Sequence, residues 1–166
     1  PEFDEAENSV KEKISRLMNV KGKRSVDAIH RDLYHIMWNK VGMGRTKEGL
    51  QQAIEDLKAL KEEFWTNVFI PGEVDDMNVE LGKALRLADF IEIGDLMARD
   101  ALNREESCGG HFREEYQTEE GEALRQDDKF SYASCWKYMG ENVDPEMLKE
   151  SLEYEFTERK TRNYKN

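Results

Sequence analysis

Apolar residues recur at every third or fourth position along the first part of the chain. This spacing places them on one side of an α-helix and leaves polar residues on the other. It predicts helices over residues 4–19, 26–41, 47–68 and 79–106. Short polar segments separate these stretches, so we expect three to four helices packed as an antiparallel bundle.

Residues that typically begin and end helices flank these segments. Ser25, Thr46 and Asn78 each precede a helical stretch, and each side chain can accept a hydrogen bond from an N–H group of the first turn. Gly109 and Gly110 follow the fourth stretch, and glycine commonly ends helices. The sequence therefore predicts three capped N-termini and a glycine stop for the fourth helix.

Beyond residue 110 the spacing of apolar residues changes to that of a strand. Apolar and polar residues alternate over 130–139 and again over 151–160. We expect a small antiparallel β-hairpin, with residues 140–147 as its loop, after an irregular polar segment at 111–128. The alternating positions are Phe130, Tyr132, Ser134, Trp136 and Tyr138 in the first strand and Leu152, Tyr154 and Phe156 in the second.

Together these elements predict a mainly α fold. Residues 1–110 form the helical bundle, and residues 111–166 form the polar segment and the hairpin packed on that bundle. The 166 residues suit one domain, which is large enough to bury a core without metals or disulfides. The acidic, polar start shows no signal peptide, and the missing initiating Met suggests a fragment or a processed product.

The charge of the chain excludes several classes of partner. Its formal net charge is −11, and 37% of its residues are charged. Binding to nucleic acid or to an anionic membrane surface requires clustered Lys and Arg, so we expect neither. No apolar run approaches the length of a transmembrane helix, so we expect no direct membrane insertion. Cys108 and Cys135 are too few for a disulfide framework and fit a reducing compartment, although one bridge between them stays open.

Candidate chemistry is concentrated between residues 104 and 128. Cys108 and His111 supply only two possible metal ligands, and a structural zinc site normally has four. Cys108 follows a helix C-terminus among carboxylates, which raise a thiol pKa and disfavour a nucleophile. No Gly-rich motif for binding a dinucleotide or a nucleoside triphosphate is present. We therefore predict no catalytic, cofactor-binding or metal-binding residue in this chain.

The same segment carries a family resemblance. Its sequence "ALNREESCGGHFREEY", followed by "RQDD", resembles a C-terminal segment of the flavoprotein subunit of succinate dehydrogenase and fumarate reductase. Residues 25–50 and the ending "ERKTRNYK" at 158–165 are also similar to that family. Cys108 departs from the pattern, which has Arg there. The matching positions are Arg104, Glu106, Ser107, Gly109, Gly110, His111, Arg113, Glu114, Arg125, Asp127 and Asp128.

The resemblance implies that the chain is the C-terminal helical domain of a subunit that interconverts succinate and fumarate. In that family FAD and the catalytic residues lie in flavin and capping domains, which precede the equivalent of Ser25. The fragment alone would then be inactive and hold no cofactor. Through its parent it would join an iron-sulfur subunit and a membrane anchor. The parent would be cytoplasmic, peripheral on the inner face of the cytoplasmic membrane.

We expect residues 104–128 to act by docking onto the parent's flavin or capping domain. Ser107 would satisfy backbone groups at the helix end, and Arg104, Arg113 and Arg125 would pair with carboxylates. An isolated domain would also expose aromatic residues that the parent covers. Two other interpretations stay open: the same domain of L-aspartate oxidase, and a free-standing acidic helical interaction module. The aromatic residues expected to be exposed are Trp65, Trp136 and Tyr138.

Overall fold

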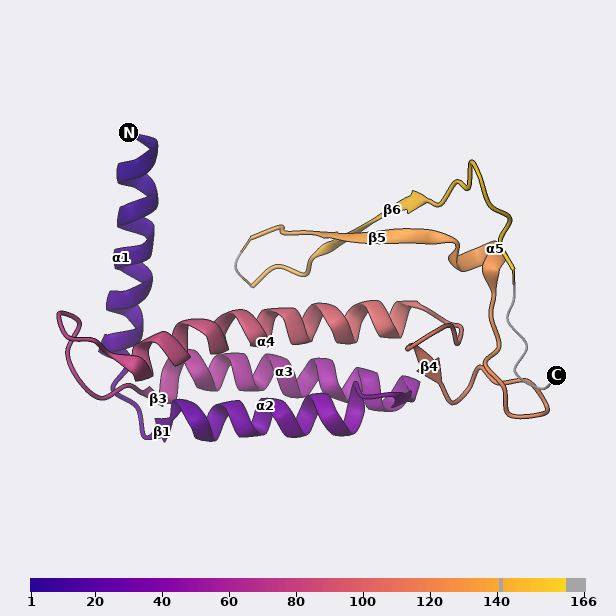
Figure 1. Ribbon diagram of the computed structural model, residues 1–166. Helices are drawn as coiled ribbons and strands as arrows, with labels where there is room; N and C mark the ends of the chain where they lie inside the picture. Colours follow the sequence, from indigo (N-terminus) through magenta and orange to yellow (C-terminus); the bar gives the residue numbers. More distant parts are fainter. Residues whose placement is uncertain (141, 161–166) are drawn as a thin grey trace. The chain divides into compact units, whose positions relative to one another are not determined.

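The computed structural model describes residues 1–140 and 142–160, so the end of the motif at 158–165 lies partly outside the described residues. The chain forms two compact units, Pro1–Arg125 and Gln126–Asn166. The first unit is helical and the second contains the hairpin (Figure 1). The predicted mainly α class with a helical bundle is confirmed. The first unit extends past residue 110, because the segment after the fourth helix folds back onto the helix ends.

Four long helices make up most of the first unit: α1 (Glu2–Val20), α2 (Val26–Lys40), α3 (Lys47–Asn67) and α4 (Val79–Asn103). They match the four predicted segments. The helices α2, α3 and α4 lie side by side, with α3 antiparallel to the other two (Figure 1). The helix α1 projects from one end of this bundle, and within it only Leu17 is buried. The bundle proper therefore has three helices.

Buried apolar residues form one core between the helices. Gly94 of α4 is buried where the helices approach closely, since a Cβ atom at this position would lie 3.1 Å from the Sδ atom of Met37. The other core residues are Leu17, Val26, Ile29, Leu33, Val41, Leu50, Ala53, Leu57, Leu60, Phe64, Val68, Ile70, Leu81, Ala84, Leu87, Ala88, Ile91, Ala98 and Ala101.

All three predicted N-caps are present. Ser25 Oγ accepts a hydrogen bond from the N–H of Ala28 at 3.2 Å. Thr46 Oγ1 and Asn78 Oδ1 accept equivalent bonds at 3.0 Å and 2.9 Å. The predicted glycine stop is wrong, because α4 already ends at Asn103 and Arg104 is extended. A later side chain, described below, caps this helix end.

Two very short parallel ladders join the loops at the ends of the bundle. The strand β1 (Arg24–Ser25) pairs with β3 (Val68–Phe69), and β2 (Gly44–Arg45) pairs with β4 (Phe112–Arg113). The second ladder ties the turn between α2 and α3 to the segment that follows α4. It thereby brings parts of the chain that are far apart in sequence to one end of the bundle.

The second unit contains a short helix, α5 (Asp127–Phe130), and two antiparallel strands, β5 (Tyr132–Lys137) and β6 (Glu146–Ser151). The first predicted strand is confirmed. The second is wrong, because Tyr132 pairs with Ser151 and the ladder lies before the predicted 151–160. Positive φ angles at Gly140 and Asn142 accompany an earlier reversal of the chain.

Two further expectations concern single side chains. Both cysteines are free thiols, so the possible bridge between them is absent. Trp65 is only partly exposed, because it packs against the core and under the guanidinium of Arg16, whose Cζ atom lies 4.1 Å from the ring centroid. Tyr138 is well exposed, as predicted.

Among the described residues, no helix is both long enough and apolar enough to cross a membrane.

Candidate functional site

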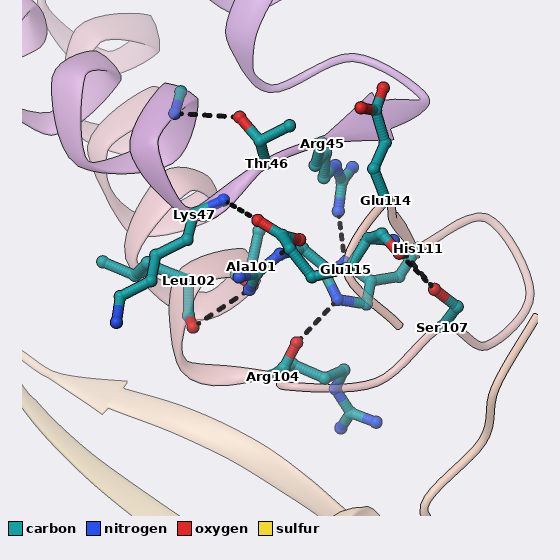
Figure 2. Close-up of polar contacts among 12 residues, drawn as sticks. Arg45, Thr46, Lys47, Ala101, Leu102, Arg104, Ser107, His111, Glu114 and Glu115 are labelled. Carbon is teal, nitrogen blue, oxygen red and sulfur yellow. Dashed lines mark hydrogen bonds and ion pairs between the residues drawn. The ribbon is translucent and has the colours of Figure 1, made fainter. Parts of the chain in front are cut away.

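The segment that follows α4 makes a tight turn and then returns to the end of the bundle (Figure 2). Cys108 N donates to His111 O at 2.8 Å, and His111 N donates to Cys108 O at 3.1 Å. A hairpin turn with two central residues favours a positive φ angle at the first of them, and Gly109 has φ +60°. We use the name corner for residues 106–115 and the residues they contact at Arg45–Lys47 and Ala101–Arg104.

Arg113 is the buried centre of the corner, with 1% of its surface exposed. Its Nη1 donates to the carbonyl oxygens of Ala101 and Leu102 at 3.0 Å and 3.2 Å. These carbonyls belong to the last turn of α4, where backbone acceptors lack partners within the helix. A cation there also interacts favourably with the helix dipole. The guanidinium therefore caps the C-terminus of α4.

Ser107 holds the backbone of Arg113 in place. Its buried hydroxyl accepts a hydrogen bond from Arg113 N at 2.8 Å and donates one to Arg113 O at 3.1 Å. The prediction that Ser107 satisfies the helix end is therefore wrong. Ser107 hydrogen-bonds to the backbone of β4, and the Arg113 side chain donates to the carbonyl groups at the end of α4.

Glu115 links Arg113 to the start of α3. Its carboxylate accepts from Arg113 Nε at 3.1 Å and from the backbone N–H of Lys47, the first residue of α3 (Figure 2). Burial raises the pKa of Glu115, but the hydrogen bonds from Lys47, its own backbone and Arg113 outweigh this and lower it. The carboxylate is thus held charged at a helix N-terminus, where the dipole favours a negative charge.

Arg45 and His111 connect the turn after α2 to the turn after α4. Arg45 Nε donates to the carbonyl oxygens of Val41 and Gly42 at 3.2 Å and 2.7 Å. Arg45 Nη1 lies 2.7 Å from His111 Nδ1, and His111 Nε2 lies 2.9 Å from Arg104 O (Figure 2). Arginine can only donate, so Nδ1 is the acceptor and Nε2 carries the proton. The geometry therefore requires a neutral His111.

The charges around His111 agree with this neutral state. Burial lowers the pKa of His111, and the nearby cations of Arg45, Arg113 and Arg104 lower it further. The hydrogen bond to the Arg104 carbonyl has the opposite effect but does not prevail. Burial, with Arg113 nearby, also lowers the pKa of Arg45, while Asp100 opposes this change.

The structure brings most, but not all, of the family-motif residues together. Arg104 pairs with the buried carboxylate of Glu106 at 2.8 Å, and Arg113 pairs with Glu115, as predicted for these arginines. Arg125 is the last residue of the first unit. Asp127 and Asp128 belong to the second unit, where Arg159 lies 3.4 Å and 3.6 Å from their carboxylates. The motif is therefore divided between two units.

Arg45, Lys47 and Glu115 are corner residues that the sequence reasoning did not single out. The ladder between β2 and β4 is only two residues long and carries no periodic signal. Arg45 nevertheless lies in the stretch at residues 25–50 whose Gly-x-x-Arg spacing resembles the family. That spacing was the available signal for Arg45. Nothing comparable marks Glu115, because carboxylates are abundant throughout this chain.

The charged groups of the corner contact one another or backbone atoms, and they connect the start of α3 to the end of α4. In the described part of the chain, no group of three or more His, Cys, Asp or Glu side chains is placed to hold a metal ion. Cys108, which stands where the resemblance has Arg, contributes its backbone to the turn.

Comparison with protein families gives one match over most of the chain. The family model described as "Fumarate reductase flavoprotein C-term" matches residues 30–164. A fumarate reductase flavoprotein subunit from Proteus vulgaris is 31% identical over 111 residues, which are 67% of this chain and 18% of that protein. An uncharacterised FAD-dependent oxidoreductase from Methanocaldococcus jannaschii is 29% identical over 112 residues, 68% of this chain and 20% of that protein.

L-aspartate oxidase 1 from Ralstonia nicotianae is 31% identical over 88 residues, 51% of this chain and 15% of that protein. The chain thus spans about a fifth of the length of these relatives or less. Solved structures share its fold. The quinol fumarate reductase of E. coli has a TM-score of 0.73 at 22% identity, covering 95% of this chain and 26% of that one. Adenylylsulfate reductase from Archaeoglobus fulgidus has a TM-score of 0.70 at 20% identity, covering 92% of this chain and 26% of that one.

Proposed function

The chain belongs to the fumarate reductase flavoprotein C-terminal family, and from this premise we propose that it is the C-terminal domain of an FAD-dependent subunit that interconverts succinate and fumarate. Two fumarate reductase flavoprotein subunits, from Proteus vulgaris and a Serratia strain, are among the relatives it resembles. The chain spans only a fifth of such proteins, so the reaction belongs to the larger parent protein.

The corner is the observation that supports a structural role for this domain. Arg104 of the family motif pairs with the buried carboxylate of Glu106, and the side chain of buried Arg113 donates to the last carbonyls of α4. A residue that binds substrate or transfers a proton must face the reacting atoms, and buried Arg113, Ser107 and Glu106 are already engaged within the first unit. The exposed turn at Gly109 and Gly110 is left to dock onto the parent's flavin or capping domain.

FAD, which would accept a hydride from succinate or return one to fumarate, is held by other parts of the parent. The sequence lacks the Gly-rich turn that binds the pyrophosphate of a dinucleotide, which supports this division. The parent would exchange electrons with an iron-sulfur subunit, and a membrane anchor subunit would hold this assembly at the membrane. It would lie on the inner face of the cytoplasmic membrane.

A second parent is supported by one specific similarity. L-aspartate oxidase 1 from Ralstonia nicotianae shares 31% identity with this chain over 88 residues. The domain would have the same structural role in either parent, because the corner is built from residues within the domain. The two proposals differ only in the substrate of the parent, L-aspartate or succinate.

The test is the purification of the parent from its source with an antibody raised against this chain. We expect a band far heavier than the 19.5 kDa of this chain, a flavin absorption spectrum, and reduction of fumarate by a reduced dye. Oxidation of L-aspartate without turnover of succinate or fumarate would favour the second parent. A single band at the size of this chain would contradict both and favour a free-standing interaction module.

The control is the 166-residue chain purified alone and mixed with FAD. We expect it to remain colourless after removal of free flavin and to leave fumarate unreduced. A yellow, active preparation of the chain alone would contradict the proposed division of labour between this domain and the rest of the parent.

A further inference from the structure

An apolar surface runs along two neighbouring helices of the first unit. Its residues come from α2 and α4, and each has between 46% and 70% of its surface exposed. Soluble monomers seldom leave a continuous patch of large apolar side chains in water. We use the name α2–α4 face for the residues Tyr34, Trp38, Phe90, Ile93 and Met97.

Contacts within α2 and between α2 and α4 support the view that these residues belong to one surface. The ring of His30 on α2 lies 5.9 Å from the ring of Phe90 on α4, measured between centroids. The rings of Tyr34 and Trp38 stack at 6.0 Å, with an interplanar angle of 25°. Farther along, Gly94 of α4 packs against Met37 of α2. The exposed residues therefore flank the line along which α2 and α4 meet.

The helix α4 is apolar on two sides. One side faces the core through residues such as Leu87, Ile91 and Ala98. The second side carries Phe90, Ile93 and Met97, spaced three and four residues apart, as on a single helix face. A surface helix normally has one apolar side, and a helix that is apolar around most of its circumference is normally buried on more than one side.

The other helix pairs present charge to the solvent instead. Lys40 of α2 pairs with Asp56 of α3, and Lys61 of α3 lies 2.6 Å from Glu92 of α4. Between α2 and α4, Lys83 Nζ lies 3.1 Å from Asp27 Oδ1. This ion pair is near the start of both helices. The apolar surface is therefore confined to one side of the bundle.

We propose that the α2–α4 face is the surface on which the remaining, flavin-binding part of the parent packs. This inference rests on the proposed function and names the contact surface. The chain spans 20% of the relative from Methanocaldococcus jannaschii and 18% of the one from Proteus vulgaris, so about four-fifths of each relative lies outside it. Trp, Tyr, Phe and Met are enriched in the buried centres of interfaces. The occupant is an apolar, weakly charged surface of the same polypeptide.

The test is hydroxyl-radical footprinting of the purified parent beside the isolated chain. We expect oxidation of Trp38, Phe90 and Met97 to fall several-fold in the parent. Met77, with 97% of its surface exposed in the loop before α4, is the internal reference and stays reactive in both samples. Equal oxidation of the three face residues in the two samples would overturn the proposal. So would protection that develops in the isolated chain as its concentration rises, because that identifies a second copy as the occupant.

A pair of variants tests the same surface by mutation. Trp38→Glu and Met97→Glu in the parent should cause a several-fold loss of intact flavoprotein during size-exclusion chromatography, whereas Met77→Glu should not. The isolated chain carrying each substitution should melt as the unmodified chain does, which separates failed packing from failed folding. Neither readout depends on which substrate the parent turns over. Protection of the face in a parent inactive with succinate and fumarate would therefore reject the proposed function and retain this surface.

Discussion

The corner and the α2–α4 face distribute their side chains in opposite ways. In the corner, charged and polar groups such as Arg113 and Ser107 are buried and point into the unit. On the face, Trp38 and its neighbours remain in contact with water. Burying a charge is costly unless it is paired and hydrogen-bonded, and exposing large apolar groups is unfavourable unless something covers them. We therefore expect the polar motif to stabilise the domain itself and the apolar face to contact a neighbour.

The strongest test of this contrast removes the centre of the corner. Arg113→Ala leaves two carbonyls of α4 without their donor and opens a cavity, so we expect a loss on the order of 3 kcal/mol in the free energy of unfolding. Urea denaturation followed by far-UV circular dichroism measures it, because the long helices lie in the first unit. Arg31→Ala, at an exposed position on α2, is the matched control. Equal losses for the two variants would show that the corner is dispensable.

Removing the hydroxyl of Ser107 should have a smaller effect in the same direction. Ser107→Ala deletes two hydrogen bonds to the Arg113 backbone and leaves both backbone groups buried, so we expect about 1–2 kcal/mol. Ser9→Ala, on the exposed side of α1, should change the unfolding midpoint little. A midpoint for Ser107→Ala that matches the unmodified chain would mean that β4 is held by its ladder alone.

The corner should also weaken in mild acid. The folded pKa of His111 is lowered, so the unfolded chain binds this proton more readily, and stability falls as the pH drops through the unfolded value of about 6.5. Glu115 adds to this loss of stability only at lower pH. Its folded pKa is lowered, so the stabilisation by its charged carboxylate is complete above the unfolded value of about 4.3 and is lost as the pH falls through the folded value.

Urea midpoints at pH 7.5 and pH 5.5 measure the His111 effect. We expect His111→Gln to show a smaller difference between the two midpoints than the unmodified chain. The ring of His35 packs edge-on against Tyr34 outside the corner, so His35→Gln should retain the full difference between the two midpoints. If His111→Gln shows the same difference between the midpoints as the unmodified chain, another group causes the loss of stability in acid.

The smallest effect is expected on the face. Trp38→Gln removes an apolar side chain that is 70% exposed, so the unfolding free energy of the isolated chain should change by no more than about 0.5 kcal/mol. The urea measurement used for the corner applies here too. A loss of several times this size would mean that the aromatic stack on α2 belongs to the core of the isolated domain.

The sequence predicted well those elements whose signal is local. Four helices and three caps follow from periodicity and from Ser25, Thr46 and Asn78, because capping and amphipathicity are properties of short stretches. The second strand was misplaced because Leu152, Tyr154 and Phe156 also alternate. The position of the loop, and not alternation alone, sets which residue faces Tyr132.

The corner could be only partly predicted for a related reason. The motif resemblance identified Arg104, Ser107, His111 and Arg113 as a group, but their partners come from distant parts of the chain. A two-residue ladder at Arg45 has no periodicity, and a single Glu among many carboxylates has no distinguishing pattern. The docking role of the motif stays a prediction.

The ladder between β2 and β4 has a consequence for the order of folding. Contacts within and between consecutive helices are close in sequence, whereas residues 44–45 and 112–113 can meet only after a long loop has closed. We expect the helices to assemble first and the ladder between β2 and β4 to form only after the transition state for folding. In stopped-flow experiments, Ser107→Ala should then chiefly hasten unfolding and leave refolding almost as fast as before. The corner would set how long the folded domain lasts rather than how quickly it forms.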